Sequence, residues 1–244
     1  MTVYVDVTEF LRNPVRTGIQ RVCGELCRWW PGDDLVPVAL SANSRLVPLP
    51  SNARSVIRSY FEAGPDDLPK IREVISQIAD DSRQSQGEID SYASPIVVPE
   101  VFYDPKRIEF FQTLLLRQYY NVYFIFYDAL PITHPQYFPP QTSYETIEPY
   151  FRLVRHAKHV GFISRSTRDV FCQRLLRRSD FDGPVLRLGS DSMGKPSPRP
   201  GNPGLKFTVV GTIEPRKQHA LVLDAFERLF PEMPDLSLTF IGRM

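Results

Sequence analysis

The chain has 244 residues, enough for one large domain or for one domain and part of another. Hydrophobic residues make up 42% and charged residues 23%, which argues against wholesale disorder and allows a packed core. The formal net charge of +1 argues against nucleic acid or an acidic membrane as the main partner, so any anion site has to be local.

The cysteines and the N-terminal segment indicate the cellular compartment in which the protein is expected. There are three cysteines, of which Cys23 and Cys27 lie one helical turn apart on an apolar face, and no cysteine–histidine group has zinc spacing. We therefore expect buried, reduced thiols in a cytoplasmic protein. The opening MTVYVDVTEF contains Asp6 and Glu9 and lacks the features of a signal peptide. No run approaches the ~18 apolar residues of a membrane span.

The first third of the chain alternates strands with helices. Residues 3–7 (VYVDV) predict a strand, and Arg16-Thr17-Gly18 predicts a turn before a helix. Two short strands follow, whose Pro37 and Pro48 favour a sheet edge. These two strands are expected at 36–40 and 45–49. They are followed by a predicted helix at 54–63, a helix with the face Ile71, Val74, Ile75 and Ile78, and a mobile polar loop at 80–91.

The next stretch repeats this alternation. The run VYFIFY at 122–127 is apolar without alternation, which is typical of a strand covered on both faces. It leads to Asp128 and a proline-rich loop, ALPITHPQYFPP. The other predicted elements are strands at 96–98, 159–163 and 185–188 and helices at 106–120, 144–154 and 166–178.

Strand–helix–strand repetition with doubly buried strands predicts an α/β fold with a mostly parallel sheet. In such sheets ligands bind at the carboxyl ends of the strands. This directs attention to the loops that follow Val7, Tyr127, Ile163, Leu188 and Val210.

A break in composition separates a second unit. Residues 191–204 (DSMGKPSPRPGNPG) hold four prolines and three glycines and predict an interdomain linker. A strand at 206–210, an amphipathic helix and a strand at 236–241 then predict one βαβ unit. About 40 residues cannot bury a core alone, so this unit should lean on the first domain, on another chain or on further sequence. We favour further sequence, because the last strand ends without a cap.

The loop of this βαβ unit carries two adjacent cations. The stretch VVGTIEPRKQH leads from the strand through Gly211 to Arg216 and Lys217, just before a helix expected to begin near Gln218. A helix N-terminus has unpaired N–H groups and partial positive charge, so it suits an anion. The alternative is a solvated pair in which one cation forms a salt bridge with Glu214.

Several segments together resemble one protein family. VVGTIEPRKQHALVLDAFERL resembles the start of the C-terminal domain of family-four glycosyltransferases of the GT-B fold, which commonly read V-G-x-x-x-P-R-K before a helix. VYVDVTEFLRNPVRTGIQRVCGEL, FIFYDALPITHPQYF, VGFISRSTRDVF and VLRLGSD resemble, in order, segments of the N-terminal domain. The resemblance covers most of 1–30, 120–190 and 205–244.

The resemblance implies a domain plan and site residues. Residues 1–190 would form a Rossmann-like, acceptor-side domain, 191–204 the linker, and 205–244 the truncated start of the nucleotide-sugar-binding domain. Arg216 and Lys217 would grip the donor diphosphate and stabilise the leaving nucleoside diphosphate, with Gly211 and Gly18 beside the same phosphates. Asp128 would hold an acceptor hydroxyl or the sugar. Gly18 as an ordinary glycine before a helix, and Asp128 as a turn cap, stay open.

Further loop residues have plain structural explanations. His134 lies in the proline-rich loop, and Ser164 and Thr167 can cap the following helix. The chain also departs from the family at two positions. Tyr127 stands where relatives often have His, and Thr212 where many have Arg. The family's pair of glutamates that holds the donor lies beyond residue 244.

Two function classes follow. The first is a retaining glycosyltransferase, or hexosyltransferase, of polysaccharide biosynthesis, inactive alone as a truncated chain. Its partners would be a nucleotide-sugar donor and a saccharide or lipid-linked acceptor, with no nucleic acid, no metal or other cofactor, and room for peripheral membrane association. The second is a non-catalytic truncated module that binds a glycan or a partner chain. A nicotinamide-dependent dehydrogenase is disfavoured because no G-x-G-x-x-G follows the first strand.

Overall fold

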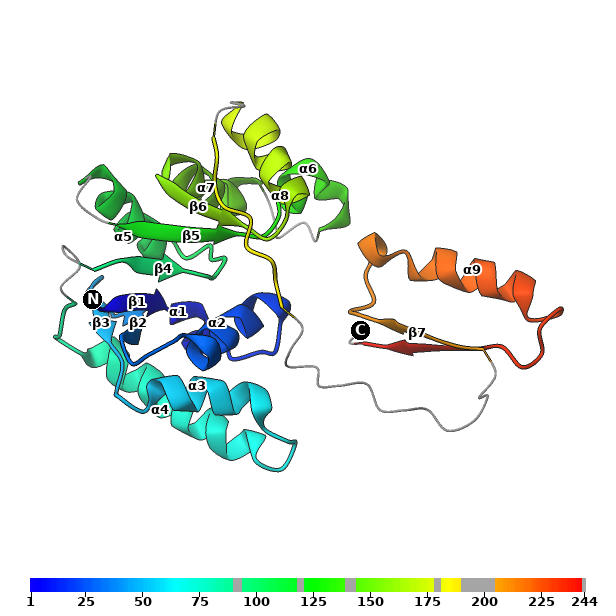
Figure 1. Ribbon diagram of the computed structural model, residues 1–244, viewed down its shortest axis with the longest axis horizontal. Coiled ribbons are helices and arrows are strands. Elements are labelled where there is room, and N and C mark those ends of the chain that lie inside the picture. The colour runs from blue at the N-terminus through cyan, green and yellow to red at the C-terminus, as the bar shows by residue number, and fades with distance from the viewer. Residues whose placement is uncertain (90–93, 118–120, 139–143, 178–180, 190–204, 243–244) are drawn as a thin grey trace. The chain divides into compact units, whose positions relative to one another are not determined.

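The computed structural model describes residues 1–89, 94–117, 121–138, 144–177, 181–189 and 205–242 (Figure 1). The chain divides into two compact units, Met1–Leu130 with Gln141–Leu188, and Pro131–Pro140 with Gly189–Met244. The predicted linker at 191–204 lies outside the described residues.

The first unit is built on a six-stranded sheet. Its strand order is β3-β2-β1-β4-β5-β6, and every neighbouring pair is parallel except β2 with β3. This confirms the predicted α/β fold with a mostly parallel sheet, which is compatible with a Rossmann-like fold. The strands are β1 (Val3–Asp6), β2 (Leu35–Leu40), β3 (Leu46–Pro48), β4 (Ile96–Val98), β5 (Val122–Phe126) and β6 (His159–Phe162).

Helices follow most strands, as the alternation predicts. They are α1 (Thr8–Arg12), α2 (Gly18–Trp29), α3 (Ala53–Glu62), α4 (Leu68–Gln84), α5 (Pro105–Leu116), α6 (Leu130–Thr133), α7 (Tyr144–His156) and α8 (Arg165–Val170), which continues as a π-helix at Phe171–Leu176. Figure 1 shows α3 and α4 beside β2 and β3, and α5 and α7 beside β4, β5 and β6.

Two apolar layers hold these helices to the sheet. Side chains of β1 and β2 form one cluster with α2, α3 and α4, in which Cys23 and Cys27 are buried and free, as predicted. On α5 and α7, the rings of Phe111 and Phe151 contact Phe124 and Phe126 of β5 at centroid distances of 5.8 and 5.9 Å. The apolar strand β5 is buried except at Tyr123, so the prediction of a strand covered on both faces holds for most of its length.

The chain reverses its direction of travel across the sheet between β1 and β4. From β1 it moves outward through β2 to β3, and then returns to the other side of β1 to add β4, β5 and β6. In doubly wound sheets, such a switch point leaves a crevice at the carboxyl ends of its two strands. Here these ends are at Asp6 and Val98.

The placement of Pro37 at a sheet edge was wrong, whereas Pro48 does lie in the edge strand β3. The N–H and C=O groups of one residue point to the same side of a strand. The carbonyl of Pro37 accepts from the N–H of Leu49, so its nitrogen faces β3 at the point where the β2–β3 ladder ends with Val38 opposite Pro48. An inner strand therefore accepts this proline without losing a bond to β1.

The polar stretch from residue 80 does not begin as a loop. Residues 80–84 continue α4, and Asp80 pairs with Arg83 at 3.1 Å while Ser82 is buried. The carbonyl of Arg83 also accepts from the N–H of Ala42, which ties this last turn to the loop after β2. Such contacts extend a helix beyond its apolar face.

Three other expectations also need correction. Residues 185–188 form no strand but a single parallel bridge between Val185 and Phe162, and Leu188 remains exposed. The proline-rich loop contains the short helix α6 and a 3₁₀ turn at Pro135–Tyr137. The five-residue helix α1 was not predicted. All three involve segments too short to show a hydrophobic period.

The second unit contains the predicted βαβ arrangement. Parallel strands β7 (Lys206–Val210) and β8 (Ser237–Ile241) flank α9 (His219–Leu229). Within the described residues 205–242, only His219 and Leu236 are buried. This agrees with the expectation that so short a unit does not bury a core of its own.

Within the described residues, no helix has the length and apolar character needed to cross a membrane.

Candidate functional site

A buried ion cluster fills the switch point at the carboxyl ends of β1 and β4. Arg107, from the first turns of α5, donates from Nε and Nη2 to Asp6 Oδ2 at 3.0 and 2.7 Å, and from Nη2 to Glu100 Oε2 at 2.8 Å. The side chains of Arg107 and Asp6 are 0% exposed and that of Glu100 is 1% exposed. We refer to Asp6, Glu100 and Arg107 as the switch-point triad.

The triad also builds the loop that follows β1. Glu100 accepts from the backbone N–H groups of Glu9 and Phe10 at 2.8 and 2.7 Å, so a side chain from beyond β4 satisfies the open N-terminus of α1. Asp6 Oδ1 accepts from the N–H of Thr8 at 3.1 Å, and Thr8 Oγ1 accepts from Leu40 of β2. The ends of β1, β2 and β4 are thereby joined.

Burial changes the acidity of this cluster. It raises the pKa of Glu100 to about 7, an effect that the Arg107 charge and the N–H donor of Glu9 oppose and the Asp6 carboxylate reinforces. The same burial raises the pKa of the neighbouring Cys23 thiol, whose Sγ lies 4.0 Å from Glu100 Oε1. Cys23 is therefore a protonated, unreactive thiol at neutral pH.

Aromatic side chains continue the cluster toward β5. The guanidinium of Arg107 lies 4.0 Å above the Phe102 ring, which meets Tyr150 edge-on at 5.4 Å. Burial raises the pKa of Tyr103 to about 12, with the Asp128 carboxylate adding to the effect. Burial also raises the pKa of Tyr150. These phenols therefore stay protonated at neutral pH, and the Tyr150 hydroxyl is buried without a hydrogen-bond partner among the described residues.

Asp128 lies two residues after the end of β5, and it is exposed. Its Oδ1 accepts from the N–H of Leu130 at 3.0 Å, so the capping alternative is realised in the structure. Nearby, Thr167 donates to the carbonyl of Tyr127 at 3.2 Å, and Ser164 caps α8 by accepting from the N–H of Thr167 at 3.0 Å. Asp128 remains the exposed carboxylate at this strand end, available to a ligand hydroxyl as well as to its cap.

Gly18 is the first residue of α2 rather than part of a preceding turn. Thr17 is the N-cap, and its hydroxyl accepts from the N–H of Gln20 at 3.3 Å. A Cβ built on Gly18 would meet no atom within 4 Å. No described atom therefore requires glycine here, and the open space would admit a ligand.

The two cations of the second unit lie ahead of α9. Arg216 and Lys217 belong to a 3₁₀ turn at Pro215–Lys217, and Gln218 separates them from α9 with a left-handed backbone at φ 54°. They lie just before the helix, as the sequence indicates, because the 3₁₀ turn ends before α9 begins at His219. They consequently do not oppose the dipole from within the helix.

Arg216 is paired, as the alternative foresaw. Its Nη2 lies 2.8 Å from Glu214 Oε1 on a partly exposed surface. Lys217 is exposed, and no ion pair to it is found among the described residues. A Cβ built on Gly211 would lie 3.9 Å from Lys217 Cε, so the structure brings these two predicted residues together.

Gly211 itself requires glycine. Its φ of 155° is strained for other residues, and its N–H donates to the carbonyl of Ile241 at 2.9 Å. A Cβ on Gly242, at the end of β8, would collide with the Gly211 carbonyl. The loops after β7 and β8 thus meet backbone to backbone, and the sequence analysis did not single out Gly242.

Metal ligands do not cluster in the part of the chain that the structure describes, where no group of three histidine, cysteine, aspartate or glutamate side chains could hold an ion. The predicted residues Gly18 and Asp128 belong to the first unit, and Gly211, Arg216 and Lys217 to the second. The switch-point triad was missed, although Asp6 ends an apolar strand, which is the position where a sequence signal could have been found.

Comparisons with known proteins found no matching family model, no matching curated protein and no matching solved structure.

Proposed function

We propose that the chain belongs to a glycosyltransferase of the GT-B type, in which the second unit binds the diphosphate of a nucleotide-sugar donor and the first unit binds a saccharide acceptor. The observation that carries the proposal is the loop after β7. It combines the backbone turn at Gly211 with the exposed cations Arg216 and Lys217, in the segment that resembles the family's donor-binding motif.

The interaction free energies favour binding of Arg216 to a phosphate over its salt bridge with Glu214. A surface salt bridge such as Glu214–Arg216 contributes about 0–1 kcal/mol. A charge-assisted hydrogen bond to phosphate contributes about 1.5–3 kcal/mol. A diphosphate can therefore draw Arg216 away from Glu214, and it needs no rearrangement to meet Lys217. As the glycosidic bond breaks, both cations would stabilise the negative charge on the leaving nucleoside diphosphate.

The first unit would supply the acceptor side. Asp128 lies exposed at the carboxyl end of β5, where ligands of doubly wound sheets bind. Its carboxylate can accept a hydrogen bond from an acceptor hydroxyl while its cap to Leu130 persists, because a carboxylate has several acceptor sites. In this scheme Asp128 orients the nucleophile, and the cations act on the leaving group.

Nucleoside diphosphate binding tests the proposal. We expect Lys217→Ala to weaken binding of UDP, GDP or ADP, whichever the full chain binds, by about tenfold or more, as for the loss of one charge-assisted hydrogen bond. Isothermal titration calorimetry gives the affinities. The matched control is Lys206→Ala, an exposed lysine at the opposite end of β7. Equal affinities of wild type and Lys217→Ala, or equal losses in both variants, would contradict the assigned role.

A further inference from the structure

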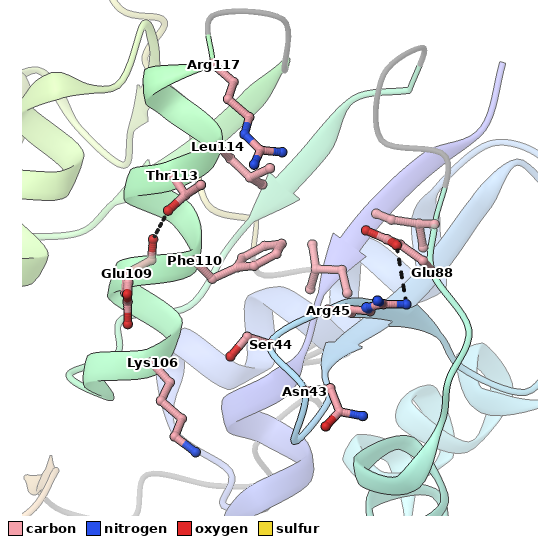
Figure 2. Close-up of a pocket in the computed structure, with 12 residues that line it drawn as sticks. Asn43, Ser44, Arg45, Glu88, Lys106, Glu109, Phe110, Thr113, Leu114 and Arg117 are labelled. Atoms are coloured by element: carbon pink, nitrogen blue, oxygen red, sulfur yellow. Dashed lines mark hydrogen bonds and ion pairs between the residues drawn. The ribbon is translucent and has the colours of Figure 1, made fainter.

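A concave site lies in the first unit, and none of the three residues of the switch-point triad lines it. It is a pocket of about 380 Å³ between α5 and the wall formed by the β2–β3 loop and residues 88–89 (Figure 2). Its size falls in the range of small-molecule sites. Leu46, Ile89 and Leu114 are buried beneath it. Neither Asp128 nor any residue proposed to bind the donor lines it.

The α5 wall of this pocket is one helical stripe. Lys106, Glu109, Phe110, Thr113 and Arg117 recur at the spacing of neighbours on a helix surface. Figure 2 shows Phe110 pointing from α5 across the pocket, with Lys106 and Arg117 toward its two ends. Phe110 is half-buried, so part of its ring is available to a ligand.

The opposite wall is polar. It contains Asn43, Ser44 and an ion pair in which Arg45 Nη1 lies 3.8 Å from Glu88 Oε2. Ser44 has a left-handed backbone with φ 55°, a conformation that costs energy for a residue other than glycine and that turns the loop at the pocket's rim.

The chemistry of the lining distinguishes among ligand classes. The lining holds three cations and two carboxylates, so an anion would meet donors at Lys106 and Arg117 but would be repelled by Glu88 and Glu109. A purely apolar ligand would desolvate five charged groups without pairing them. A sugar hydroxyl both donates and accepts, so it uses cations and carboxylates alike, and the C–H face of a sugar ring packs on an aromatic ring such as Phe110.

From this lining we infer that the pocket is a binding site for a neutral oligosaccharide, with one sugar ring against Phe110 and hydroxyls bonded to Asn43, Glu109 and the flanking cations. The acceptor role of this saccharide rests on the proposed function. One end of the pocket, at Asn43 and Lys106, lies at the carboxyl edge of the sheet, the edge that also carries Asp128. β2 and β5 are three strand spacings apart, about 14 Å, a span that several linked sugars cover.

Binding of trisaccharides to the full chain tests the inference. The probes are maltotriose, cellotriose, mannotriose and chitotriose, with inorganic pyrophosphate as the anionic comparison, and binding is followed by saturation-transfer NMR and calorimetry. We expect at least one trisaccharide to bind, Phe110→Ala to weaken its binding by about tenfold and Asn43→Ala by about threefold or more. Gln112→Ala on α5 and Asn52→Ala, an exposed asparagine without a capping bond, are matched controls and should bind like the wild type.

Three results would overturn the inference: no trisaccharide binds, binding is unchanged in both pocket variants, or pyrophosphate competes with the sugar. Asn43 is exposed, so Asn43→Ala remains informative even if Phe110→Ala unfolds. The outcome is separable from the proposed function. If the chain binds the sugar but Lys217→Ala does not change its affinity for a nucleoside diphosphate, the inferred sugar site is supported and the proposed donor site is contradicted.

Discussion

Arg107 is the side chain on which the switch point depends. It is fully buried and pairs with Asp6 and Glu100, which are themselves buried. We expect Arg107→Met to lower the free energy of unfolding by about 3–5 kcal/mol, because Asp6 and Glu100 would remain in the interior without their cation. Urea denaturation measures the change. The control Arg152→Met removes the exposed pair with Glu148 and should cost at most about 1 kcal/mol; similar losses in both variants would contradict the argument.

Glu100 gives the stability of the first unit a pH dependence. Its pKa in the folded protein is about 7, above its ordinary value of 4.5, so the folded state holds this proton more tightly than the unfolded state. The contribution of Glu100 to stability is then fully present below about pH 4.5 and is lost as pH rises to about 7, by up to roughly 3 kcal/mol. The difference in unfolding free energy between wild type and Glu100→Gln, measured across this range, should fall as pH rises. A difference that stays constant or increases with pH would refute the assignment.

Two glycines of α2 provide a matched comparison. A Cβ on Gly24 would collide with the Phe61 ring, whereas a Cβ on Gly18 would meet open space. We expect Gly24→Ala to destabilise the protein by about 1–3 kcal/mol and Gly18→Ala to stay within about 1 kcal/mol of the wild type, as thermal melting would show. If Gly18→Ala melts like the wild type yet loses nucleoside diphosphate affinity, the role inferred for Gly18 from the family resemblance gains support. Loss of stability in Gly18→Ala alone would contradict the geometry.

At the scale of elements, the sequence predicted those whose residues carry their own signal. The apolar run VYFIFY became β5, and the face beginning with Ile71 became α4. Elements that depend on distant partners were not predictable. The helix α1 has five residues and takes its N-terminal partner from Glu100, ninety positions away. Similarly, the last turn of α4 lacks apolar residues and is held by Arg83.

The candidate sites also divide into those with a local sequence signal and those that depend on distant segments. Arg216, Lys217 and Asp128 could be proposed because strand ends and cations are visible in the sequence. Arg107 looked like an ordinary surface residue near the start of a helix, and its burial emerges only when β1, β4 and α5 are assembled. The pocket beside Phe110 is likewise formed by three separate segments of the chain, residues 43–46, 88–89 and 106–117.

At the scale of the whole molecule, burial is unequally divided between the two units. The first unit contains nearly all of the buried apolar side chains, whereas the described residues 205–242 contain two buried residues. We expect a chain of residues 1–189 to unfold cooperatively in urea, and a chain of residues 205–244 to lack stable structure by circular dichroism. A noncooperative transition for 1–189, or a folded 205–244, would show that stability is distributed differently.

The cap that Glu100 provides has a consequence for synthesis. While the ribosome is still making the first ninety residues, the segment from Thr8 to Arg12 has no acceptor for its leading amide groups, and so short a helix does not persist in water. The nascent chain can therefore place β1 early, but the turn that follows it must wait for translation to pass β4 and for Glu100 to clear the exit tunnel.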